Sequence, residues 1–363
     1  MSLFFGFAQG IWNNLQAGPA KTRAHFAISR DHIDNGDKLG PRFEAGQHYF
    51  QIIINEMFLA NQRQWFVNYD PMAFVASSYI YDKQLATLPM VVGPSMLKQY
   101  EQEAPLGMIF QNTPASGLHP YQGGSLTLII ILNRLQRQNN ADKLLQVVES
   151  ISGAINPSVA FSAYLALARP ILDGVETLLG LQQTVPVLGY RSSINPAIGQ
   201  VLEPMYYVLI DAHAQQIEHD KFWVRNDSLY YGQTQDTATP YDENDFILFS
   251  IAQGDKRNDE HMLPFYPLWE STRDLASRPT GEGDHFWKEA KAQFNTMKRE
   301  LLKSPDLTVP DSKRLRVQYL DDLVKLREET IKEGKLGKGQ LTEAETELRE
   351  MAGELDKLDR PTN

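Results

Sequence analysis

Residues 123–135 read Gly-Gly-Ser-Leu-Thr-Leu-Ile-Ile-Ile-Leu-Asn-Arg-Leu, and this stretch decides the class of fold. Three consecutive isoleucines, Ile129 to Ile131, leave no polar side on an extended chain. A strand that is apolar on both sides must be covered on both sides, as in the middle of a packed sheet. The stretch therefore predicts a central strand.

Further strands are predicted on both sides of this stretch. Runs rich in Ile, Val, Phe and Tyr are separated by turn-forming pairs such as Asp70-Pro71 and Asp82-Lys83, which is typical of antiparallel strands. A hairpin turn is expected at Asn226-Asp227, because Phe222 and Val224 alternate with Trp223 and Arg225 before it. The predicted strands cover residues 48–59, 64–69, 73–81, 88–92, 205–211, 221–225, 229–231 and 245–251.

A helical pattern interrupts the strands at about residues 140–180. There Leu144, Leu145, Val148 and Ile151 recur at spacings of three and four, the stripe of an amphipathic helix. Strands and helices do not alternate regularly, so the pattern favours an α+β fold over a doubly wound one. We expect one antiparallel β-rich domain over residues 1–270, sandwich-like or an open sheet, with this helical insertion.

The composition changes near the carboxyl end. Residues 284–363 contain 16 Lys+Arg and 17 Asp+Glu, whereas residues 1–283 contain 19 and 28. A dense and balanced mixture of charges is typical of exposed helices. We expect a connecting helix within residues 271–310, followed by a helical hairpin over residues 311–363 whose second helix begins at the capping box Thr342 to Glu345.

The predicted hairpin has one apolar seam, as in a short antiparallel coiled coil. Two helices alone bury little surface, so the seam should pack on another body. One interpretation is that it packs on its own chain. The other, which we adopt as the candidate site, is that it binds another protein or a second copy of this chain. The predicted partner-binding residues are Leu315, Tyr319, Leu323, Leu348, Met351 and Leu355.

The overall composition excludes several classes of protein. Of the 363 residues, 42% are hydrophobic and 22% are charged, which fits neither a wholly disordered chain nor a polytopic membrane protein. The formal charge of −10 argues against nucleic acid as a partner. Cysteine is absent, so disulfides and thiolate chemistry are excluded, and a reducing, cytoplasmic location is favoured.

No local motif for catalysis or for a cofactor was found. The segment from Asp211 to Asp220 holds five potential metal ligands, but their spacing matches no known arrangement, and we interpret it as a solvated connection. A calcium loop starting at Asp31 would need glutamate at its twelfth position, where Arg42 stands. Glycine-flanked nucleophiles and phosphate-binding loops are also absent. We therefore predict no catalytic residue, no metal and no cofactor.

The favoured function is a non-enzymatic adaptor or assembly module that binds a protein through its carboxyl-terminal hairpin. One alternative is a membrane-active effector, which would use the Phe-rich start of the chain or the uncharged helices near residues 150–180. Another is a hydrolase whose site is assembled from residues distant in sequence, because such a site leaves no local motif.

Overall fold

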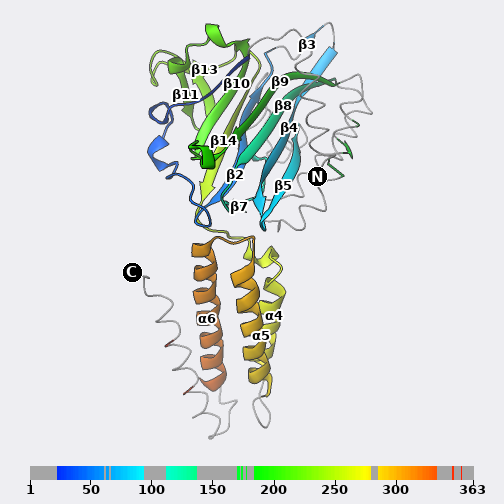
Figure 1. Cartoon of the computed structure of the whole chain (residues 1–363), viewed down its shortest axis with the longest axis vertical. Helices are drawn as coiled ribbons and strands as arrows, with labels where there is room; N and C mark the ends of the chain where they lie inside the picture. Colours follow the sequence, from blue (N-terminus) through cyan, green and yellow to red (C-terminus); the bar gives the residue numbers. More distant parts are fainter. Residues whose placement is uncertain are drawn as a thin grey trace. The chain divides into compact units, whose positions relative to one another are not determined.

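The computed structural model describes residues 23–60, 63–64, 67–93, 112–136, 184–278 and 285–332, with a few isolated positions besides. The chain divides into two compact units, Met1–Gly254 and Asp255–Asn363, which we call the β unit and the helical unit (Figure 1). Antiparallel sheets form the first, and helices form the second. The predicted α+β class is confirmed, while the sandwich-like arrangement stays a prediction.

The largest sheet of the β unit has six strands, and every pairing in it is antiparallel. Its order is β1-β10-β14-β2-β6, and β7 also pairs with β2. The strands are β1 (Arg23–Ala27), β2 (Tyr49–Phe58), β6 (Thr113–Pro114), β7 (His119–Pro120), β10 (Met205–His213) and β14 (Phe246–Gly254).

The second sheet has five strands and contains the predicted central strand. Its strands are β3 (Arg63–Gln64), β4 (Val67–Tyr81), β5 (Gln84–Val92), β8 (Leu126–Gln136) and β9 (Thr184–Ile194). β8 lies between β4 and β9, and its residues from Leu128 to Leu132 are all buried. The predicted central strand is therefore confirmed.

A third, small sheet consists of β11 (Phe222–Arg225), β12 (Ser228–Tyr231) and β13 (Thr239–Pro240). The predicted turn at Asn226-Asp227 joins its first two strands, and both residues have positive φ, 49° and 62°. Such angles belong to the two-residue hairpin turn whose twist matches that of the strands, and asparagine and aspartate tolerate them well.

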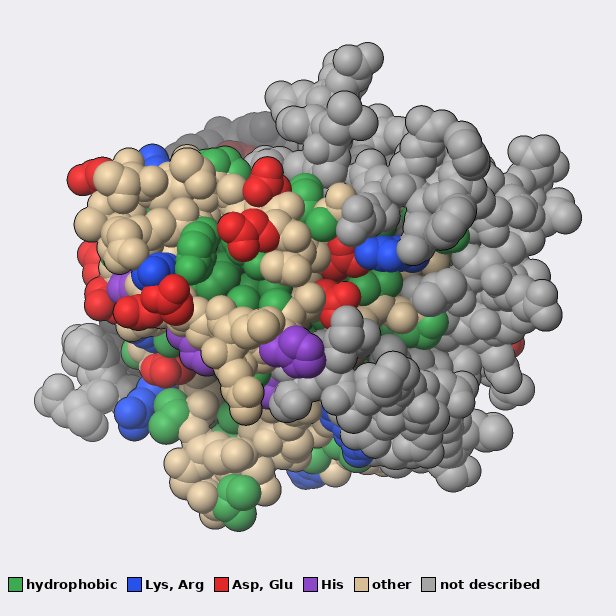
Figure 2. All heavy atoms as spheres, turned by 90° about the horizontal axis from the view of Figure 1, so that it is seen from above, with side chains coloured by type: hydrophobic (Ala, Val, Ile, Leu, Met, Phe, Trp, Pro, Cys, Tyr) green, Lys and Arg blue, Asp and Glu red, His purple; other side chains and the backbone are tan. Residues whose placement is uncertain are grey.

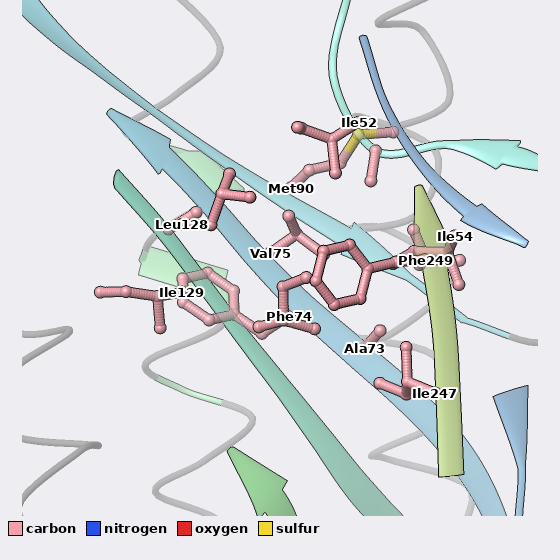
Figure 3. Close-up of a cluster of buried hydrophobic side chains, with 14 of the residues drawn as sticks. Ile52, Ile54, Ala73, Phe74, Val75, Met90, Leu128, Ile129, Ile247 and Phe249 are labelled. Atoms are coloured by element: carbon pink, nitrogen blue, oxygen red, sulfur yellow. The ribbon is translucent and has the colours of Figure 1, made fainter. Parts of the chain in front are cut away.

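Both larger sheets contribute to one buried hydrophobic cluster. In Figure 3, Ile52 of β2 and Phe249 of β14 come from the six-stranded sheet, while Val75 of β4 and Met90 of β5 come from the five-stranded sheet. Asp245 adds a polar link beside this cluster. Its two carboxylate oxygens accept hydrogen bonds from the Ala60 N–H (2.8 Å) and from Arg134 on β8 (2.5 Å).

Some strands differ from the sequence-based expectation. β4 is one continuous strand through Asp70-Pro71, where a break was expected. The pairing with β5 ends at Ala73, so among the described strands only β8 pairs with Pro71, and a sheet tolerates proline at such a position. β1 and β9 were not predicted; β9 contains Pro186 and Gly189, which weaken a strand pattern. The predicted helices between residues 141 and 179 lie almost entirely outside the described residues.

The helical unit contains α4 (Tyr266–Ser277), α5 (His285–Lys303) and α6 (Val309–Lys332). The predicted domain boundary at residue 270 falls within α4, and the predicted connecting helix, 271–310, covers the end of α4, all of α5 and the start of α6. α5 buries Trp287, Ala290, Phe294, Met297 and Leu301, a stripe with spacings of three and four. The second helix of the predicted hairpin, from Thr342, lies outside the described residues.

A buried arginine holds together the segments at the start of this unit. The Arg257 guanidinium donates to both oxygens of Asp259 (2.8 and 2.7 Å) and to the Asp306 carbonyl (3.2 Å). The backbone N–H of Arg257 donates to the Asp311 carboxylate in the first turn of α6 (3.0 Å). The Arg314 side chain donates to the same carboxylate through Nε (2.6 Å). Because the Arg257 guanidinium and the Asp259 carboxylate are hydrogen-bonded to each other, the cost of burying the charge of Arg257 is compensated.

No described helix has the length and apolar character needed to cross a membrane.

Two leucines of the helical unit provide a matched test of its core. Leu323 on α6 is fully buried, whereas Leu302 on α5 is 54% exposed. We expect Leu323→Ala to lower the free energy of unfolding of this unit by about 2 to 5 kcal/mol, because it leaves a cavity. Leu302→Ala should change it by less than about 0.5 kcal/mol. Urea denaturation followed by far-ultraviolet circular dichroism measures both, and equal effects would contradict this core.

Candidate functional site

The small sheet separates its side chains into an inner and an outer face. Phe222 and Val224 are buried, while Trp223 and Arg225 are half-buried. This alternation follows from the period of two in a strand. The hairpin therefore has an apolar inner face that packs on the β unit and a more polar outer face.

On the inner side, aromatic rings form a continuous chain. The Phe222 ring contacts those of Phe26, Tyr231 and Tyr241, with centroids 5.4, 4.9 and 5.2 Å apart. Tyr241 in turn contacts Phe246 at the start of β14 (5.7 Å). Tilted and edge-on pairs at these distances stabilise by more than their buried area alone. These ring contacts anchor the small sheet to the six-stranded one.

On the outer side, the aromatic faces are covered by side chains of the same unit. His32 stacks on Trp223 with ring centroids 3.9 Å apart, and the Arg225 guanidinium lies 5.0 Å from the centre of the Tyr230 ring. Trp223 Nε1 also donates to the Gly232 carbonyl (3.0 Å). These contacts fix the outer face, and they occupy one side of the rings on which a flat ligand would stack.

A polar network surrounds the turn between β11 and β12. The Tyr206 hydroxyl on β10 donates to one oxygen of Asp227, and Asn112 Nδ2 donates to the other (2.7 Å). Asn55 Nδ2 on β2 donates to Asn112 (2.8 Å), and the Asn226 N–H donates to Asp34 (2.8 Å). Burial, together with the hydrogen bond to Asp227, raises the pKa of the Tyr206 hydroxyl. Residues from five separate segments thus meet at one turn.

Glu56, next to Asn55 on β2, is the most perturbed carboxyl group near this network. Only 3% of the residue is exposed, and Oε2 accepts a hydrogen bond from the Leu229 N–H on β12 (2.7 Å). Burial raises its pKa to about 7, and the hydrogen bond opposes this change only in part. The carboxyl group links the small sheet to β2.

The contacts of this network hold the turn in place. Both oxygens of Asp227 already accept hydrogen bonds, and Glu56 is buried under the sheet that it contacts. A general acid or base must come within hydrogen-bond reach of its substrate. A pKa near 7 in Glu56 is therefore explained by burial at a structural contact.

The segment with five potential metal ligands makes other contacts. His219 stacks on Phe26 with centroids 4.1 Å apart, and Lys221 forms an ion pair with Glu218 (2.6 Å). Among the described residues, no group of three or more His, Asp and Glu side chains is arranged to hold a metal ion.

The predicted partner-binding residues on α6 lie inside the helical unit. Leu315, Tyr319 and Leu323 are at most 2% exposed, and the Tyr319 ring lies 4.8 Å from that of Trp269 on α4. Their apolar stripe therefore serves the packing of α6 on its neighbouring helices. Leu348, Met351 and Leu355 lie outside the described residues.

The sequence analysis missed a surface at the end of the β unit that we call the acidic face. It consists of residues 217–220, β11 to β13, residues 236–243, Phe26 and Phe58. Between residues 217 and 243 there are six Asp and Glu but only Lys221 and Arg225, a net −4 of the −10 of the whole chain. A count of charge in this window would have found it. In Figure 2, hydrophobic side chains form the floor of a shallow depression at this end, with acidic side chains beside it.

No protein-family model matches the chain, and neither the curated proteins nor the solved structures include one with significant similarity.

The buried carboxyl group predicts a specific dependence of stability on pH. The pKa of Glu56 is about 7 in the folded protein and near 4.5 when unfolded, so the folded state binds more protons between these values. Stability must fall as the pH rises through this window, and the loss is complete above pH 7. A change of this size in pKa corresponds to about 3 kcal/mol.

Glu56→Gln keeps an oxygen for the Leu229 N–H and removes the charge. We expect it to unfold at higher urea concentration than the wild type at pH 8, with the gain shrinking toward pH 4.5. Glu44→Gln, on the exposed loop before β2, serves as the control and should show no such trend. A gain for Glu56→Gln that is the same at both pH values would contradict the buried contact.

Proposed function

We propose that the protein is a non-enzymatic interaction component that joins other proteins, and that the acidic face is its principal binding surface. The single observation that carries this proposal is the combination of unneutralised charge and partly exposed apolar side chains at one end of the β unit. Exposed apolar surface bordered by polar groups is characteristic of interaction sites.

Three exposed acids of this face have no cationic partner within the described part of the chain. Asp236, Asp242 and Glu243 are exposed, and none forms an ion pair with a described residue. Some exposed acids of the helical unit do pair locally, as Asp274 does with Arg278 and Asp321 with Lys325. A local excess of one sign attracts a partner of the other sign and increases its rate of association.

This proposal moves the binding surface from the hairpin seam to the β unit, because Leu315, Tyr319 and Leu323 are occupied by packing within the helical unit. Partner binding or self-association through Leu348, Met351 and Leu355 stays a prediction. A cytoplasmic location, favoured by the absence of cysteine, belongs to the same proposal.

Photo-crosslinking in the cells that express the protein tests the proposed function. A photoreactive phenylalanine analogue would replace Ile217 on the acidic face, with Asn295 on the exposed side of α5 as the control position. We expect an adduct of defined mass at position 217 and none at position 295. The same adduct should decrease when Asp242→Asn and Glu243→Gln are added.

Two results of the crosslinking experiment would contradict the proposal. Absence of an adduct at position 217, or adducts of the same pattern at both positions, would show that this face is not a specific binding surface.

A further inference from the structure

We infer that the acidic face binds a basic segment of another protein, in which Lys or Arg residues flank one aliphatic or aromatic anchor. This inference rests on the proposed function and adds the chemistry of the partner. It is drawn from the apolar side chains of the face and from the acids that adjoin them. Asp220, Asp236, Asp242 and Glu243 form no ion pair with any residue that the structure describes.

The anchor is required by the apolar part of the face. Phe26, Phe58, Ile217 and Tyr231 are partly buried side chains that pack against the hydrophobic cluster beneath the small sheet. Phe58 stacks on Phe246, with centroids 5.6 Å apart, so its ring has a fixed position. A side chain that covered this surface would gain about 25 cal/mol for each Å² of apolar area removed from water.

The basic residues are required by the acids that adjoin the same side chains. Glu218 follows Ile217 directly, and Asp220 follows the His219 ring that stacks on Phe26. Asp242 and Glu243 follow Tyr241, and both lie close enough to act on its hydroxyl electrostatically. Acids therefore adjoin the apolar surface from two loops, one before β11 and one after β13. A charge must come within about 8 Å to be felt at physiological ionic strength, so the flanking positions of the ligand would carry Lys or Arg.

The two basic residues of this region do not neutralise the face. Lys221 is paired with Glu218 (2.6 Å). Arg225 lies over Tyr230 and donates to the Gln235 carbonyl (3.2 Å). Within the described ranges of the chain, Asp220, Asp236, Asp242 and Glu243 have no cationic partner and would be available to a ligand. The same charges would repel nucleic acid and anionic lipid, which leaves a basic peptide as the favoured class.

Three labelled hexapeptides probe the inference in titrations with the full-length protein followed by fluorescence anisotropy. Lys-Lys-Leu-Phe-Lys-Lys carries both features, Lys-Lys-Ser-Gly-Lys-Lys carries the charge alone, and Glu-Glu-Leu-Phe-Glu-Glu carries the anchor with the wrong charge. We expect the first to bind at least about tenfold more tightly than the other two, and its affinity to fall as sodium chloride is raised.

Variants locate the site. Asp242→Asn with Glu243→Gln, and separately Ile217→Asn, should each weaken the first peptide about five- to tenfold. Glu270→Gln with Glu300→Gln removes two exposed acids of the helical unit and should leave its affinity within about twofold. Thermal melts by circular dichroism check that the variants are folded.

The wild-type titrations alone can overturn the inference. If the first two peptides bind with equal affinity, or if no peptide binds, the ligand is not a basic segment with an apolar anchor. Unchanged binding in both folded acidic-face variants rejects the location. If crosslinking at position 217 still gives a specific adduct in either case, the proposed function stands and only the chemistry of the partner is wrong.

Discussion

The hydrogen bond from the Leu229 N–H to the Glu56 carboxyl group joins the small sheet to the six-stranded one, and the acidic face depends on this joint. Strands of two to four residues are not stable as an isolated sheet, so β11 to β13 must be held by the body of the β unit. Aromatic packing around Phe222 buries apolar surface between the small sheet and the six-stranded one. Glu56 and the hydrogen bond from Tyr206 to Asp227 fix the position of the small sheet. The carboxylates on the loops that flank the sheet can present a constant pattern only because of these contacts.

A local irregularity in β2 brings these polar groups together. The register between β14 and β2 shifts at this point, because Leu248 pairs with Glu56 and Phe249 pairs with Ile54, so that Asn55 is an extra residue. Such a bulge changes the direction of the side chains that follow it. Asn55 and Glu56, neighbours in sequence, thus both contact the hairpin region, Asn55 through Asn112 and Glu56 through Leu229. In a regular strand, adjacent side chains would point to opposite faces of the sheet.

Where one physical cause dominated the local pattern, the sequence predicted the structure well. The triple isoleucine of β8, the Asn226-Asp227 turn and the apolar stripe of α5 each appear as expected. β9 was missed because Pro186 and Gly189 oppose a strand locally, and its pairing with β8 outweighs them. The bulge at Asn55 could not be predicted from a local sequence pattern, and neither could the hydrogen bonds that meet at Asp227. Both features arise from the register between strands that are distant in sequence. The charge imbalance of residues 217–243 was visible in the sequence, but only the sheet shows that apolar side chains adjoin it.

The stripe on α6 illustrates why an apolar pattern alone does not identify an interface. Burial of apolar surface has no direction, so the same spacing of Leu315, Tyr319 and Leu323 suits an internal neighbour and a partner equally well. In this chain the stripe is buried, and Tyr319 packs on Trp269 of α4. Charge carries different information, because a protein seldom gains by leaving like charges crowded together on its own surface. The helical segment has nearly equal numbers of acids and bases, whereas residues 217–243 around the small sheet have three times as many acids as bases. Uncompensated repulsion of this kind would be relieved by a basic partner, which is why the proposed binding surface is placed on the acidic face and not on the α6 stripe.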